Sequence, residues 1–157
     1  MSHLYARDIR LLVIDNNPAD VWLLREALRI SHFPVQLTVA RDGIEATRYL
    51  RQLEANRGDY PDLVLLDLNL PRRSGREVLA DIKRSATLQT IPVVILSSSL
   101  TIAERRRLFQ MQAAEVLTKL PEFAAHVEVV RGLEIFWQAS PDLRQTARSF
   151  SCRLVPE

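Results

Sequence analysis

The chain has 157 residues, of which 47% are hydrophobic and 25% are charged. This composition is ordinary for a globular protein with a full core and excludes intrinsic disorder as a class. The length suits one domain of average size, so we expect one folded domain with a short tail. The apolar runs are far shorter than the roughly 20 residues that a membrane span needs, and the first eight residues contain no apolar signal core. We therefore expect a soluble, cytoplasmic protein with no membrane partner.

Charge and cysteine content exclude two further classes. The 21 basic and 19 acidic residues give a formal net charge of +2, and the two signs are interspersed, so no nucleic-acid partner is expected. A single cysteine, Cys152, excludes a disulfide framework or a thiolate metal cluster within the chain. Only two of the basic residues are lysines, Lys83 and Lys119, so the position of each lysine is informative.

Strand and helix patterns alternate along the chain. Ile9 to Ile14 is a near-continuous apolar run, as in a strand buried on both faces. Pro18 then opens a helix, with apolar residues at helical spacing, that ends near Ser31. The same alternation occurs five times. Further strands are expected over 35–40, 63–67, 92–96 and 114–118, and further helices over 44–53, after Gly75, over 101–112 and over 121–137.

Such alternation predicts an α/β fold, a doubly wound five-stranded parallel sheet with helices on both faces. The common strand order for five strands is 2-1-3-4-5, the flavodoxin-like order. We expect this domain to occupy residues 1–137, and a tail over 138–157 to contain one short helix beginning near Ser140. Ligands of such folds bind at the carboxyl ends of strands one and three, where Asp15 and Asp67 lie.

Polar side chains follow the apolar strands at this edge of the sheet. Asp15 and Asp67, with nearby oxygen donors, are typical of a site for Mg²⁺, which accepts one or two carboxylates and keeps several waters. A hydroxyl and an ammonium suit a phosphoryl group, and Asp67 can act as a nucleophile toward phosphorus. Any one of these acids alone could equally cap a loop. The candidate set is Asp15, Asn16, Asp67, Asn69, Ser97 and Lys119.

Several segments together resemble one family. The segment Leu66–Leu79, the run Asn17-Pro18-Ala19-Asp20-Val21, the segment Ile91–Ser99 and the run Gly132–Trp137 are similar to response-regulator receiver domains. They resemble in particular the small receivers that serve phytochrome-type histidine kinases. The resemblance covers residues 8–137, and its strength lies in the agreement of spaced elements.

The resemblance implies a role for each residue of the site. Asp67 would accept a phosphoryl group from the histidine of a sensor kinase. Asp15, mainly through water, and the main-chain carbonyl of Asn69 would hold Mg²⁺. Ser97 would bind a phosphoryl oxygen, and Lys119 would pair with both Asp67 and the phosphoryl group. The implied protein is a phosphoacceptor in a signalling relay and not an enzyme with a separate substrate.

Three positions depart from the family pattern. Asn16 stands where the family usually has an acid that ligates the metal directly, so weaker Mg²⁺ binding is expected. Val116 stands where an aromatic ring often couples to the site hydroxyl, so that relay cannot operate as usual. Leu120 separates Lys119 from Pro121, although proline commonly follows the lysine directly.

Three functions compete. The first is a single-domain response regulator that relays its signal by protein interaction. The second is a pseudo-receiver, an interaction module independent of phosphorylation. In that case Asn16 would indicate a metal site that has lost its function. The third is a phosphohydrolase on a related scaffold, which the sequence disfavours because Asp67-Leu68-Asn69 offers no second carboxylate as general acid.

Two helices suggest partner surfaces. Trp22 lies off the apolar stripe of the first helix, so we expect it to be partly exposed, either flat on its own helix or available to a kinase. The last helix has more apolar residues than one buried stripe needs. The surplus predicts a homodimer through that helix, with Phe136 and Trp137 between subunits, or a tail over 143–154 that covers the same face. The residues concerned are Val127, Val129, Val130, Leu133, Ile135, Phe136 and Trp137.

Overall fold

The structure is a computed structural model, and it describes residues 7–138. Strands and helices alternate along this part of the chain, as the sequence predicts. The strands are β1 (Ile9–Ile14), β2 (Val35–Ala40), β3 (Leu63–Asp67), β4 (Val93–Ser97) and β5 (Glu115–Thr118). The helices are α1 (Pro18–Ser31), α2 (Gly43–Asn56), α3 (Gly75–Arg84), α4 (Ile102–Gln110) and α5 (Phe123–Gln138).

The five strands form one parallel sheet in the order β2-β1-β3-β4-β5, which confirms the predicted topology. Strands β3 and β4 are buried at every position, because each has strand neighbours on both sides and helices above and below. This explains why their sequences are continuous apolar runs instead of alternating patterns. The switch point lies between β1 and β3, where Ile14 pairs with Leu66.

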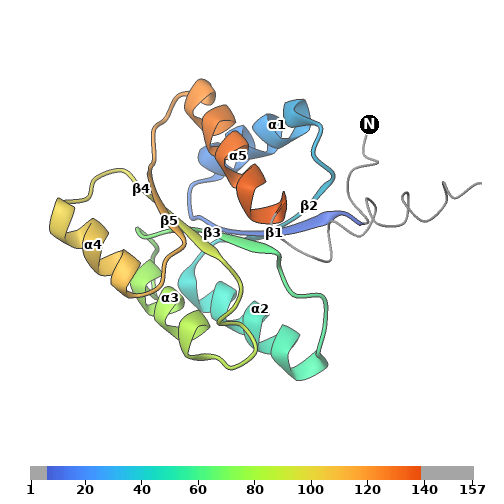
Figure 1. The fold of residues 1–157 in the computed structure, drawn as a ribbon, viewed down its shortest axis with the longest axis vertical. Helices are drawn as coiled ribbons and strands as arrows, with labels where there is room; N and C mark the ends of the chain where they lie inside the picture. The colour runs from blue at the N-terminus through green and yellow to red at the C-terminus, as the bar shows by residue number, and fades with distance from the viewer. Residues whose placement is uncertain (1–6, 139–157) are drawn as a thin grey trace, which may run out of the picture.

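Helices cover both faces of the sheet (Figure 1). Helices α1 and α5 lie on one face, and α2, α3 and α4 lie on the other. Successive side chains of β1 divide between the two layers: Leu11 and Val13 join the core under α1 and α5, whereas Leu12 and Ile14 join the core under the other three helices. The carboxyl ends of the strands are thus held between two packed layers.

Polar caps fix where the helices begin. The Asn17 side chain accepts hydrogen bonds from the backbone N–H groups of Ala19 and Asp20, and Pro18 occupies the first turn of α1. Thr101 and Glu104 form a capping box at the start of α4. Asp42 and Ser74 cap α2 and α3 in the same way. These caps hold the loops that follow β1, β2, β3 and β4 close to the strand ends.

Some details differ from the sequence expectations. Ile44, the first apolar residue of the helix expected over 44–53, is 41% exposed and lies two residues after the N-cap Asp42. Strand β4 extends to Ser97, and α5 begins at Phe123, two residues beyond Pro121. The tail expected over 138–157 lies outside the described residues except for Gln138. Within residues 7–138, no helix is long and apolar enough to cross a membrane.

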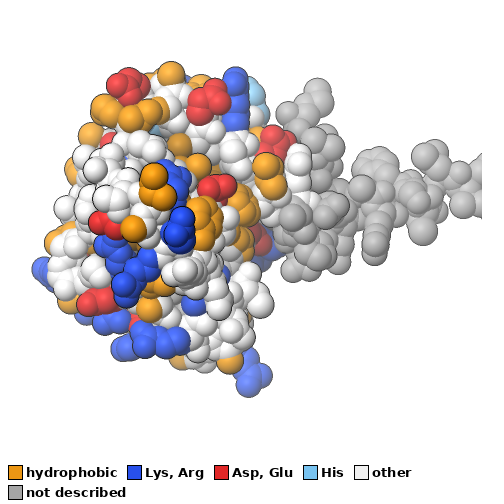
Figure 2. Space-filling model, turned by 60° about the vertical axis from the view of Figure 1, so that its left-hand side comes forward, with side chains coloured by type: hydrophobic (Ala, Val, Ile, Leu, Met, Phe, Trp, Pro, Cys, Tyr) orange, Lys and Arg blue, Asp and Glu red, His pale blue; other side chains and the backbone are white. Residues whose placement is uncertain are grey.

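Helix α5 packs its apolar surplus mainly onto its own chain. Trp137 is only 1% exposed and meets the ring of Phe33 edge-on, with ring centroids 5.1 Å apart. The expectation that Trp137 lies between two subunits is therefore wrong, because its ring completes the core between α5 and the sheet. Ile135 is the outward exception at 71% exposed. Figure 2 shows apolar side chains on one face as small groups among charged ones.

Candidate functional site

The strand order brings the predicted polar residues to one edge of the sheet. Asp15 follows β1 directly, Asp67 ends β3, Ser97 ends β4 and Lys119 follows β5. Asp15, Asp67 and Ser97 are buried although they are polar. The backbone N–H of Lys119 donates to the carbonyl oxygen of Ser97 at 2.9 Å, which fixes the start of the lysine side chain beside β4.

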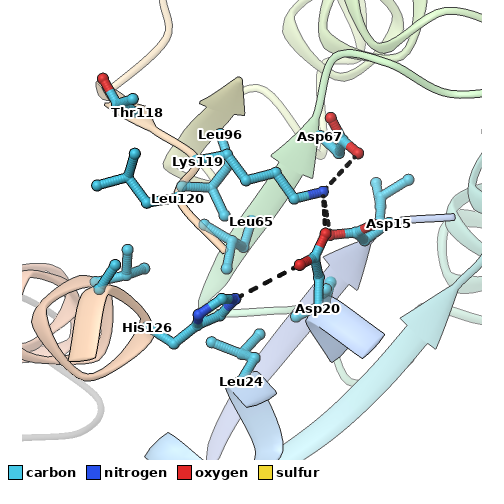
Figure 3. A pocket seen from close by; sticks show the side chains of 14 residues that line it. Asp15, Asp20, Leu24, Leu65, Asp67, Leu96, Thr118, Lys119, Leu120 and His126 are labelled. Atoms are coloured by element: carbon cyan, nitrogen blue, oxygen red, sulfur yellow. Dashed lines mark hydrogen bonds and ion pairs between the residues drawn. The ribbon is translucent and has the colours of Figure 1, made fainter. Parts of the chain in front are cut away.

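The ammonium of Lys119 lies among three carboxylates (Figure 3). Its Nζ atom is 2.9 Å from Oδ2 of Asp15, 2.9 Å from Oδ2 of Asp67 and 2.8 Å from Oδ2 of Asp20. An ammonium has three N–H donors, so each donor can meet one carboxylate. The predicted trio of Asp15, Asp67 and Lys119 is thus brought together, and Asp20 joins it.

The second oxygen of each site acid is held by the backbone. Oδ1 of Asp15 accepts the N–H of Asn17 at 2.8 Å, and Oδ1 of Asp67 accepts the N–H of Asn69 at 3.0 Å. The loop after Asp67 also requires Gly75, because a Cβ atom there would lie 2.6 Å from the carbonyl oxygen of Asp67. The orientation of both carboxylates is therefore set by local chain geometry as well as by Lys119.

The remaining predicted residues lie at the same edge without joining this cluster. Asn16 and Asn69 are exposed. The Ser97 hydroxyl is 3.5 Å from the carbonyl oxygen of Ser99, a long contact within its own loop. Val116 is buried in the core beside β4.

Two residues of this region were not selected from the sequence. Asp20 from α1 binds Lys119, and His126 from α5 places its Nε2 atom 3.9 Å from Oδ1 of Asp20. A signal was available, because both lie on the buried stripes of their helices. Asp20 precedes the buried Leu24 by four positions, and His126 precedes the buried Val130 by four. A titratable residue on a buried stripe is the pattern to look for.

Burial and charge compete in setting the site's protonation. Burial raises the pKa of Asp15 above its ordinary value of 3.8, against the hydrogen bonds from Asn17 and Lys119, and the negative charge of Asp67 raises it further. Burial alone would lower the pKa of Lys119, but its hydrogen bonds to Asp20, Asp15 and Asp67 raise it above the usual 10.5. Lys119 therefore stays an ammonium while Asp15 bears a cost for its charge.

The donor set fits a small hard cation. Asp15 and Asp67 supply two carboxylates, each oxygen of which keeps a lone pair beyond its present hydrogen bond. No group of three or more His, Cys, Asp or Glu side chains among residues 7–138 is arranged to hold a metal. Two carboxylates at one edge of the sheet fit Mg²⁺, which takes one or two carboxylates and completes its shell with carbonyls and water. It would share both acids with Lys119.

The cost of the Asp15 charge leads to a stability prediction. Because its pKa is raised in the fold, the charged carboxylate destabilises the native state above that pKa, and the cost disappears as the pH falls through it. Asp15→Asn should therefore raise the free energy of unfolding at neutral pH by more than the roughly 0.5 kcal/mol typical of surface changes. The gain should shrink in acid. Urea unfolding at several pH values measures it, with the exposed Asp59→Asn as control; a loss of stability at neutral pH would contradict it.

Comparison with known proteins identifies the family of this chain. The response regulator receiver domain model matches residues 11–131. The response regulator Rcp1 of Synechocystis sp. is 37% identical over 128 residues, which cover 81% of this chain and 87% of that protein. The probable methanogenesis regulatory protein FilR2 of Methanothrix harundinacea is 34% identical over 134 residues, covering 83% and 86%.

Solved structures agree with the sequence matches. The phosphorylated cyanobacterial phytochrome response regulator RcpA has 39% identity and a TM-score of 0.76, covering 87% of this chain and 98% of that one. The Mn²⁺-bound form of Rcp1 has 35% identity and a TM-score of 0.74, covering 86% and 98%. The chain therefore belongs to the response regulator receiver domain family.

Proposed function

We propose that this protein is a response regulator in which Asp67 accepts a phosphoryl group from a sensor histidine kinase, in a Mg²⁺-dependent reaction, and which relays the signal by protein interaction. The observation that carries the proposal is the contact of Lys119 with both Asp67 and Asp15 at the switch point of the sheet. The phosphorylated relative RcpA supports it by analogy. The protein is then a phosphoacceptor and has no substrate to turn over.

The proposed reaction assigns a task to each residue. An oxygen of Asp67 forms a bond to phosphorus while the bond from phosphorus to the kinase histidine nitrogen breaks. Lys119 balances the negative charge of the phosphoryl oxygens, and the Ser97 hydroxyl donates a hydrogen bond to one of them.

The metal would belong to the same edge. Asp15, Asp67 and the main-chain carbonyl of Asn69 would hold Mg²⁺, with Asn16 as a weak ligand. When bound, the ion supplies positive charge that offsets the repulsion between the phosphoryl group and the acids. The Mn²⁺-bound relative Rcp1 supports a divalent cation in this family.

A groove beside the site supports a kinase partner. It has a volume of about 800 Å³ and is lined by Asp15, Asn16, Trp22, Arg25 and Arg41, among others. Trp22 is 59% exposed, as expected from its place off the apolar stripe. A kinase segment in this groove would meet an aromatic ring and two cations next to Asp15 of the site. The resemblance to phytochrome response regulators points to a phytochrome-type kinase, and such a relay would act in the cytoplasm.

Phosphorylation of Asp67 is directly testable. Incubation with acetyl phosphate and Mg²⁺ should add one phosphoryl group to the intact mass, because Asp67 is a carboxylate beside an ammonium and a cation site. Asp67→Asn should abolish the gain, and the exposed Asp59→Asn should retain it. Labelling that persists in Asp67→Asn would contradict the assignment. A wild-type protein that takes up no phosphate, also from its kinase, would favour a pseudo-receiver.

The exposed Asn16 leads to a prediction about the metal. Restoring a carboxylate there by Asn16→Asp should tighten Mg²⁺ binding by about 1 to 4 kcal/mol, from Coulomb's law at about 4 Å with an effective dielectric constant between 80 and 20. Titration calorimetry measures the change, and Asn17→Asp, one position further along, controls for added charge alone. Equal or weaker affinity in Asn16→Asp would contradict a role for this position as a ligand.

We also propose that two copies of the chain pair through α5. With Trp137 in the core, the contact would rest on Ile135, which is 71% exposed, and on the half-buried Phe136. A twofold axis would place the same helix of each copy in contact. The alternative cover, a tail over 143–154, lies outside the described residues.

Sedimentation tests this pairing. The wild-type chain should sediment as a dimer at tens of micromolar, and Ile135→Glu should sediment as a monomer because a charge would be buried at the axis. Ile102→Glu on α4, where Ile102 is 81% exposed, should remain a dimer. A wild-type monomer, with and without phosphate, would contradict the dimer.

A further inference from the structure

Four titratable side chains form a row that leads away from the site. Figure 3 shows Asp67 on one side of the Lys119 ammonium, Asp20 on the other, and His126 beyond Asp20. The two oxygens of Asp20 face different partners. Oδ2 lies 2.8 Å from Nζ of Lys119, and Oδ1 lies 3.9 Å from Nε2 of His126. Asp20 is therefore the link between the site and helix α5.

The link is shielded from water, so its charges interact strongly. The side chains of Lys119, Asp20 and His126 are 15%, 14% and 8% exposed, and Leu24 and Val129 line the same space. Coulombic attraction is larger in such surroundings than on an open surface. A cavity of about 20 Å³ borders all three titratable groups, which leaves room for small side-chain movements.

The hydrogen bonding of His126 shows what it would gain from Asp20. Its Nδ1 atom lies 2.9 Å from the carbonyl oxygen of Glu122, and a carbonyl only accepts, so Nδ1 carries a hydrogen. In the neutral ring Nε2 then presents a lone pair toward the Asp20 carboxylate. A protonated ring would present an N–H instead. At 3.9 Å this hydrogen bond is not made, and Asp20 is held by Lys119.

We propose that Asp20 is a positioning residue for Lys119, and that a phosphoryl group on Asp67 shifts Asp20 from Lys119 toward His126. This inference rests on the proposed function and extends it to α5. Phosphoryl oxygens next to Asp67 draw Nζ away from Asp20, which lies on its opposite side. The released carboxylate then pairs with a protonated His126. Since Val116 removes the aromatic relay of the family, this row offers α5 another means of sensing phosphorylation.

The chain's few histidines and lysines make the row measurable. It contains three histidines, one of them the exposed His32, and two lysines, so NMR signals of labelled rings and ammonium groups can be assigned. His126 is faced by Asp20 from α1. Lys119 lies beyond Asp20, followed by Asp15 and Asp67. On its other ring nitrogen, His126 contacts the main-chain carbonyl of Glu122, just before α5. The ring nitrogen signals of His126 therefore report on Asp20.

The first measurement uses the unphosphorylated full chain. Asp20→Asn should shift the ring nitrogen signals of His126, because the carboxylate that Nε2 faces is removed. Lys119→Met should shift them in the opposite direction, and this change should be much smaller when Asp20→Asn is also present. Glu122→Gln removes a charge just before the same helix as a matched control and should leave the signals nearly unchanged. Unchanged signals in Asp20→Asn, or an equal change on Lys119→Met with and without Asp20, would overturn the inference.

The second measurement adds acetyl phosphate and Mg²⁺, with mass spectrometry of the same sample, and does not depend on the folding of Lys119→Met. Phosphorylated wild type should show shifted His126 ring signals and a shifted Lys119 ammonium signal, while the signals of His32 and Lys83 stay constant. Asp20→Asn should become phosphorylated without the His126 shift. A phosphorylated wild type with an unmoved His126 would overturn the inference. A chain without phosphate would contradict the proposed function, and the unphosphorylated variants would still decide the role of Asp20.

Discussion

The site depends on a single ammonium placed among three carboxylates. Asp15 follows β1, Asp67 ends β3 and Asp20 lies in α1. None of them has another cation at hydrogen-bond distance among the described contacts. Without Lys119 their mutual repulsion in a buried setting would destabilise this arrangement. With it, the cluster still carries excess negative charge. An anionic ligand can therefore enter only where Lys119, or an added cation, turns toward it.

This constraint explains why the fold matters to the chemistry. The Lys119 backbone is hydrogen-bonded to Ser97 of β4, which holds the start of the side chain in place while its Nζ atom contacts the carboxylates. Every partner of its Nζ atom lies on a different element, and α1 packs beside α5 on the same face (Figure 1). A movement of this one ammonium would therefore change the contacts of Asp15, Asp67 and Asp20 together. Because the strand ends are closely packed, even a small movement of the ammonium would change its contacts with the carboxylates.

The sequence predicted the sheet and the strand-end acids because both depend on local patterns. Apolar runs ending in Asp15 and Asp67 identify central strands, and the topology then brings their ends together. Asp20 and His126 were missed because their significance is tertiary: each lies on a buried stripe, and only the packing of α1 against α5 shows that the stripes meet. The burial of Trp137 was misjudged for a related reason. The number of apolar residues in α5 does not show that the ring of Phe33 from the same chain packs against Trp137.

The positions of the acids also decide whether Asp15 and Asp67 bind the Lys119 ammonium or a metal ion more strongly. Asn16 is an amide where the family usually has an acid, so the exposed side of the site, where a hydrated cation would approach, has one negative charge fewer. Asp20 places a negative charge on the buried side of the site, next to Lys119. Both differences favour the ammonium over a divalent ion in the competition for Asp15 and Asp67. Lys119 therefore already contacts Oδ2 of both Asp15 and Asp67 when no ion is bound. In the proposed reaction a metal ion would share these acids with Lys119, and a phosphoryl group on Asp67 would then draw the ammonium toward itself.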